Sequence, residues 1–134
     1  MTERLELYRC VVCGNLVEIV FNGYGQLVCC GQNMIQLEEQ TNADELLNEK
    51  HVPVIDRTED GVFIKVGYTT HPMIPEHYVT MIEAHSADKR YVKRKYLYPG
   101  ESPELHLKCT CENLIAREYC NIHGLWTSKE HLGN

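Results

Sequence analysis

Residues 10–31 read CVVCGNLVEIVFNGYGQLVCCG, and the four cysteines of this stretch decide how the start of the chain folds. Cys10 and Cys13 are separated by two residues, so both thiolates can grip one ion, and the glycine that follows lets the chain turn tightly. Cys29 and Cys30 bring the set to four sulfurs. Four thiolates suit zinc or a single iron, and spacing alone favours neither. Because the second pair is adjacent in sequence, we expect a distorted tetrahedron.

The segment around these cysteines predicts a small β domain over residues 1–38. LVEIVF at 16–21 is typical of a strand, and the Asn-Gly-Tyr-Gly sequence that follows it predicts a turn. So short a segment buries too little apolar surface to fold unaided, and it needs a staple such as a metal.

The composition changes near residues 38–50, since histidines are absent before His51, and we place a domain boundary there. Residues 41–48 predict a short linker helix that begins with a capping-box pattern. From residue 52 to the end, short segments rich in Val, Ile and Tyr alternate with turn signals. This pattern predicts an all-β second domain over residues 39–134, an antiparallel sandwich whose last strand is LIAREY at 114–119.

Composition excludes several classes of protein. The 134 residues contain no apolar run of the ~18 residues that a membrane span needs, and the opening resembles no signal peptide, so we expect a cytoplasmic protein. In that compartment the seven cysteines are expected as metal ligands or thiols rather than disulfides. The net charge of −6 argues against nucleic acid and means that an anionic substrate requires a local positive patch.

A second cluster of potential ligands lies in the later part of the chain. Cys120 and His123 repeat the two-residue spacing, and His71 and His77 stand at the two ends of a loop that Pro72 and Pro75 keep from being helical. His51 precedes the first strand of this domain. The residues alone make this site plausible and leave it open that each histidine is an ordinary surface or core residue, the reading that we adopt for His85, His106 and His131.

Together these motifs resemble the two-iron superoxide reductases, the desulfoferrodoxins, over nearly the whole chain. The shared features are Cys-x-x-Cys-Gly with Cys-Cys-Gly, then the motifs Glu49-Lys-His-Val-Pro53, His71-Pro-Met-x-x-x-His77 and Cys120-Asn-Ile-His-Gly124.

The resemblance implies a desulforedoxin-like domain followed by an immunoglobulin-like β-sandwich, a homodimer, and two irons in each chain. It assigns the first iron to four thiolates: Cys10, Cys13, Cys29 and Cys30. It assigns the second iron to four equatorial histidines and one axial thiolate: His51, His71, His77, His123 and Cys120. It also implies that the second iron, five-coordinate and ferrous, reduces superoxide to hydrogen peroxide, with electrons from a rubredoxin-like donor.

Lys50 and Glu49 are the residues that we expect to take part in catalysis. Lys50 immediately precedes a ligand, so its charge can attract the anion and stabilise the negative product, and the resemblance adds proton delivery through water. The resemblance also suggests that Glu49 occupies the sixth position in the resting ferric state and swings away on reduction. The axial thiolate pushes electron density onto the metal, which favours release of peroxide.

Three other functions remain possible on sequence grounds: an electron-transfer protein whose second iron only relays charge, a zinc-stapled binding module, and a superoxide dismutase. Two features fall outside the resemblance. Cys109 and Cys111 are expected as two thiols on one face of a strand, and Ile74 with Pro75 is expected to stiffen the histidine loop.

Overall fold

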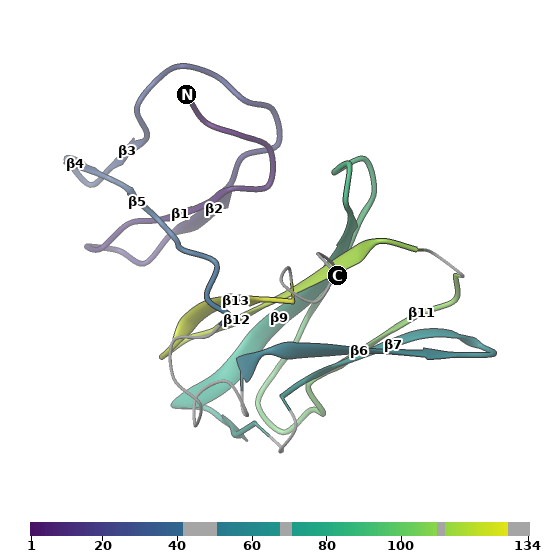
Figure 1. Ribbon diagram of the computed structural model, residues 1–134. Coiled ribbons are helices and arrows are strands. Elements are labelled where there is room, and N and C mark those ends of the chain that lie inside the picture. Colours follow the sequence, from purple (N-terminus) through teal and green to yellow (C-terminus); the bar gives the residue numbers. More distant parts are fainter. Residues whose placement is uncertain (42–50, 68–70, 110–111, 129–134) are drawn as a thin grey trace. The chain divides into compact units, whose positions relative to one another are not determined.

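In the computed structural model, the described residues are 1–41, 51–67, 71–109 and 112–128. The chain divides into two compact units, Met1–Glu38 and Glu39–Asn134. The described elements are β-strands, which confirms the all-β prediction (Figure 1). The helix predicted over residues 41–48 lies, apart from Thr41, outside the described residues. Within the described parts of the chain, no helical segment has the length and apolar character that a bilayer crossing requires.

The first unit consists of short strands around two tight turns. One sheet has the order β2-β1-β5, and its strands are β1 (Leu7–Arg9), β2 (Leu16–Glu18) and β5 (Ile35–Gln36). A separate hairpin pairs β3 (Val28–Cys29) with β4 (Gln32–Asn33).

The core of the first unit is small. Its buried apolar residues are Leu5, Leu7, Cys10, Ile19 and Met34, whereas Val20, Phe21 and Tyr24 are largely exposed. The strand predicted over residues 16–21 ends at Glu18; Ile19 still packs into the core, but Val20 and Phe21 point into solvent.

The second unit is a sandwich of two antiparallel sheets, as the sequence predicted. The larger sheet has the order β10-β9-β12-β13, with β8 also paired to β9. Its strands are β8 (Met73–Ile74), β9 (His77–Ser86), β10 (Val92–Tyr96), β12 (Leu114–Cys120) and β13 (Gly124–Thr127). The smaller sheet has the order β11-β7-β6, with β6 (Pro53–Thr58), β7 (Gly61–Val66) and β11 (Glu104–Leu107). Aliphatic side chains from both sheets form one buried cluster, which includes Ile64, Val79, Ile82, Leu105 and Ala116.

β13 was not predicted, because residues 120–126 read as a metal motif rather than a strand. Gly124 adopts a left-handed backbone with φ +86, so the chain reverses directly after β12. Cys120 then pairs with Gly124, and β13 forms the edge of the larger sheet opposite β10. The prediction that β12 is the last strand is therefore wrong, and this short hairpin carries two of the predicted iron ligands.

Candidate metal centres

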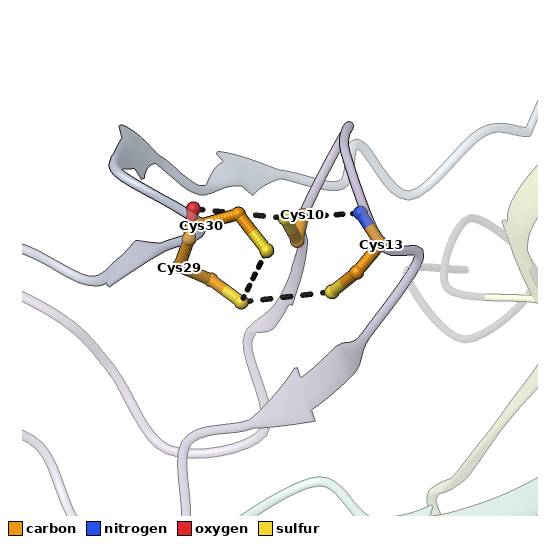
Figure 2. A group of neighbouring side chains, drawn as sticks. All are labelled: Cys10, Cys13, Cys29 and Cys30. Atoms are coloured by element: carbon orange, nitrogen blue, oxygen red, sulfur yellow. Dashed lines mark hydrogen bonds between the residues drawn. The ribbon is translucent and has the colours of Figure 1, made fainter.

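The first candidate centre is made by the two turns of the first unit. Figure 2 shows the side chains of Cys10, Cys13, Cys29 and Cys30 gathered around a common centre. Their sulfur atoms all lie within 4.8 Å of one another, and the Sγ atoms of Cys13 and Cys29 are 3.6 Å apart. The structure thus places the four predicted thiolates together, in a set that fits one tetrahedral ion.

Backbone conformation explains how adjacent cysteines share this centre. Cys30 has φ +54 and Gly31 has φ +74, so two successive residues adopt the left-handed region. That conformation costs a non-glycine residue roughly 1 kcal/mol or more, and it turns the Cys30 side chain toward its neighbour, whose sulfur is 3.9 Å away. At the other turn, Gly14 has φ +84 and its N–H donates to the Cys10 carbonyl.

The first set of thiols is arranged to hold a cation. The main-chain N–H of Cys13 donates to the Cys10 sulfur and lowers the pKa of Cys10 to about 6. Hydrogen bonding with Cys13, Cys29 and Cys10 raises the pKa of Cys30 to about 12, and repulsion from a Cys10 thiolate adds a smaller effect in the same direction. Four thiolates at one centre therefore require a positive ion, which agrees with the prediction of a metal.

The second candidate centre is a ring of four imidazoles in the second unit. Between neighbours in the order His51, His71, His77, His123, the ring centroids lie 4.5, 5.0 and 5.0 Å apart, and the closing pair, His123 with His51, lies 4.7 Å apart. The diagonal from His51 to His77 is longer, at 6.3 Å. Four nearly equal sides and a longer diagonal describe a square, the arrangement expected of four equatorial ligands.

Individual nitrogens identify which atoms can act as ligands. His71 donates through Nδ1 to the Pro72 carbonyl at 2.7 Å, so its Nε2 is left to face the centre. That Nε2 lies 3.0 Å from Nδ1 of His51, close enough for both atoms to reach one ion. Nδ1 of His123 is buried and has no hydrogen-bond partner among the described residues. A buried nitrogen of this kind fits a ligand.

Cys120 supplies the thiolate beside this ring. It is completely buried, and its Sγ lies within 4.8 Å of ligand atoms of His51, His71 and His77. The register between β12 and β9 shifts between Tyr119 and Cys120, and such a bulge re-aims the side chain at the end of a strand. Burial raises the pKa of the Cys120 thiol, while the main-chain N–H groups of His123 and Ile122 oppose that effect. A bound cation would favour the thiolate further.

Asn121 ties the Cys120 turn to the strand that carries His77. Its Oδ1 accepts from the N–H of Tyr78 at 2.9 Å, and its Nδ2 donates to the Glu76 carbonyl at 3.1 Å. The amide therefore binds the main chain of the residue before His77 and of the residue after it. The sequence did not identify this role, because a polar residue between two ligands reads as an ordinary turn residue.

Glu118 and Trp126 form the buried wall behind His51. The Trp126 ring stacks on the His51 ring with centroids 5.0 Å apart, and both side chains are fully buried. Glu118 Oε2 lies 3.8 Å from His51 Nδ1, and neither Glu118 oxygen has a hydrogen-bond partner among the described residues. Burial raises the pKa of Glu118 well above its usual range. Neither residue was predicted from the sequence, although Glu118 and Cys120 stand two apart in a strand.

The remaining predicted residues have varied placements. Glu49, Lys50, Cys111 and His131 lie outside the described residues. Cys109 is disulfide-bonded, so the expectation of a thiol is wrong there, and it follows the end of β11, so strand geometry does not apply to it. His85 is a buried residue that donates to the Ser86 carbonyl, and His106 packs its ring on Phe63, in agreement with the ordinary roles expected for both.

Several known proteins are similar to this chain in sequence and in fold. The sequence model described as desulfoferrodoxin matches residues 42–129, and that of the desulfoferrodoxin N-terminal domain matches residues 2–37. A desulfoferrodoxin homolog of Archaeoglobus fulgidus is 48% identical over 128 residues, which span 96% of this chain and 99% of that protein. A superoxide reductase of Pyrococcus abyssi is 30% identical, over 72% of this chain and 98% of its own. The crystal structure of the superoxide reductase from Treponema pallidum superposes with a TM-score of 0.71 at 25% identity, covering 96% of this chain and all of the other.

Proposed function

The chain belongs to the desulfoferrodoxin family, and we propose that it is a superoxide reductase that converts superoxide to hydrogen peroxide at the second centre. The observation that carries the proposal is the square of four imidazoles beside a completely buried thiolate. The names of the Pyrococcus and Treponema relatives support the choice of superoxide as substrate. The two donor sets fit two irons in each chain. One set is four thiolates, and the other is the thiolate of Cys120 with the imidazoles of His51, His71 and His77, which the neighbouring ring of His123 completes.

A ferrous ion bound at the second centre would supply the one electron that superoxide takes up. The protein's part is to hold five donors in place and to leave a position for the substrate. His51, His71 and Cys120 are buried, whereas the side chains of His77 and His123 are only partly covered. The Cys120 thiolate, buried and facing two main-chain N–H groups, is the donor that tunes the metal.

Lys50 and Glu49 complete the proposed mechanism. Lys50 directly precedes the proposed ligand His51 in the sequence. The net charge of −6 repels an anion, and the positive charge of Lys50 next to a ligand would attract it to the centre. The same charge would stabilise the negative product and help deliver a proton through water. Glu49 is proposed to occupy the open position in the oxidised resting enzyme and to leave it on reduction.

The proposal includes an electron source and a quaternary state. One electron is consumed for each superoxide, so an external reductant must replace it, and we propose a rubredoxin-like protein. The family resemblance also supports a homodimer, and we propose a cytoplasmic location.

The decisive experiment combines metal counting with pulse radiolysis. The proposal predicts two irons per chain and a rapid second-order reaction of the reduced protein with superoxide. Hydrogen peroxide should form without molecular oxygen, whereas release of oxygen in the absence of a donor would indicate a dismutase. Zinc in place of both irons, with no change in absorption on reduction, would contradict the proposal.

Lys50→Ala tests the proposed steering of the anion. We expect a second-order rate constant lower by roughly 10-fold and no longer declining with added salt, because steering by a local charge is screened by ions. Iron content should stay unchanged. Lys93→Ala is the matched control, since Lys93 is an exposed lysine on β10 of the same unit. An unchanged rate constant for Lys50→Ala would remove Lys50 from the mechanism.

A further inference from the structure

Gln40 lies at the start of the second unit and binds the turn that carries His123. Its side-chain Nε2 donates to the His123 carbonyl at 2.7 Å and lies 3.2 Å from the Leu125 carbonyl. Its main chain adds a donor bond to the Leu125 carbonyl and accepts from the Thr127 N–H, both at 3.0 Å. Gln40 thereby forms a short parallel bridge with Trp126 at the edge of the larger sheet.

Neighbouring groups fix Gln40 in this position. Glu39, the residue before it, accepts an ion-pair hydrogen bond at 3.1 Å from Arg117, which is almost completely buried in β12. On the other side, a Cβ atom at Gly124 would lie only 3.1 Å from the Gln40 Nε2 atom. Glycine at 124 therefore allows both the left-handed turn and the close approach of the Gln40 amide.

The carbonyl of His123 receives a second hydrogen bond, from Trp126 Nε1 at 3.1 Å. Both lone pairs of that oxygen are thus used by side chains that stand outside the turn. The main chain of His123 is held from two directions, by Gln40 on one side and by the tryptophan behind His51 on the other.

This restraint matters because of the nitrogen that His123 offers. Its Nδ1 is buried, has no hydrogen-bond partner in the part of the chain that the structure describes, and is bonded to the ring carbon nearest the backbone. Only Cβ and Cγ separate that nitrogen from Cα. A shift or rotation of the main chain at His123 therefore also moves the ligand atom.

We propose that Gln40 is a positioning residue for the second iron, acting through the His123 carbonyl to set the position of Nδ1. The inference rests on the proposed occupation of this centre by iron and does not depend on which substrate the iron meets. Residues that orient metal ligands typically contribute 10- to 100-fold to metal affinity, and an effect in that range is expected here.

Gln40→Met tests the proposal in the full-length protein loaded with both irons. Methionine keeps the length of the side chain and the main-chain bonds but removes the amide donor. We expect iron to leave the second centre 10- to 100-fold faster in excess chelator, with wild-type retention at the first centre. Trp126 is the only tryptophan and stacks on His51, so recovery of its fluorescence reports this loss. The electron paramagnetic resonance spectrum of the ferric second centre should also change, since it reports ligand geometry.

Two further variants separate positioning from general stability. Gln36→Met is the matched control, because it also removes one amide donor, to Glu6 at 2.8 Å, but in the first unit. Gln40→Asn keeps an amide donor with shorter reach and should lie between wild type and Gln40→Met in its rate of iron loss.

The proposal is overturned if Gln40→Met releases iron and gives a resonance spectrum like those of wild type. It is also overturned if the Asn and Met variants are equally impaired, or if iron loss only parallels a fall in thermal stability of the metal-free chain. If wild-type protein holds no iron at the second centre, the proposed function fails instead.

Discussion

His85 shows how burial alone changes the chemistry of an imidazole in this protein. It is 4% exposed in β9, and its Nδ1 donates to the Ser86 carbonyl at 2.8 Å. Burial lowers its pKa below the ordinary value of 6.5, with Arg117 acting in the same direction and the carboxylates of Glu83 and Glu39 opposing it. The neutral form is therefore favoured in the folded state.

The pH dependence of stability follows from that shift. Below pH 6.5 an unfolded chain protonates His85 while the folded chain does not, so the unfolded state binds more protons and the free energy of unfolding falls as the pH is lowered. His85→Asn keeps a donor for the Ser86 carbonyl but cannot titrate. We expect the variant to lose less stability than wild type between pH 7 and pH 5, as measured by urea unfolding at each pH. Parallel curves for the two proteins would show that His85 does not contribute.

Residue types and spacing were enough to predict the four thiolates of the first centre, whereas the full ligand set of the second centre was predicted from the family resemblance. Cysteine and histidine are the usual ligands of iron and zinc, so they can be recognised as candidates by residue type, and the family motifs show which of them bind each metal. The residues that support them are different. Gln40, Asn121 and Trp126 act through hydrogen bonds and stacking across the fold, and nothing in their local sequence indicates those partners. Glu118 is intermediate, since strand alternation places it on the same face as Cys120.

Among the strands, the hairpin from β6 to β7 depends on one glycine. Gly61 has φ +136, and a Cβ atom there would lie 2.1 Å from the Leu107 carbonyl oxygen in β11. β11 pairs with β7 from Glu104 to Leu107, so the turn before β7 lies against the end of β11. Gly61 belongs to one of the turn signals that alternate with the predicted strands, but the sequence could not show which strand would approach it.

Gly61→Ala should destabilise the second unit strongly. The substitution combines a disfavoured backbone conformation with a clash against main-chain atoms, which cannot move aside as a side chain can. We expect a loss of at least about 2 kcal/mol in the free energy of unfolding, measured by urea denaturation. Gly25→Ala is the control, because no atom lies within 4 Å of a Cβ at that position. Equal stability of the two variants would contradict this account.

Strand prediction succeeded where a segment rich in Val, Ile and Tyr follows a clear turn, as for residues 114–119, which form most of β12. It failed in two places, one where the residues are exposed and one where they are buried. In the first unit, apolar residues continue to Phe21, but Val20 and Phe21 are largely exposed, so the strand was predicted too long. In the second unit, β13 is almost fully buried but only four residues long. It follows directly after the metal-binding residues Cys120 and His123, so no apolar pattern marks where it begins.

At the scale of the whole chain, each unit contains one complete donor set. The four thiolates lie within Met1–Glu38, and the described histidine and cysteine ligands of the second centre lie within Glu39–Asn134. The second unit also has a continuous apolar core of its own, whereas the first has few buried side chains. The first unit should therefore depend on its metal for folding, and the second should not depend on the metal of the first.

Cys13→Ser tests this independence. Removing one of four thiolates should release the first iron and unfold residues 1–38, so that one iron per chain remains by metal analysis and amide exchange becomes fast in the first unit alone. The pre-reduced variant should still react with superoxide at a rate within about twofold of wild type, because the second centre keeps its five donors and its core. Val12→Ser is the control, since Val12 is 58% exposed in the same turn and supplies no ligand. Loss of the superoxide reaction in Cys13→Ser, with the second iron still bound, would show that the first centre takes part in the reaction itself.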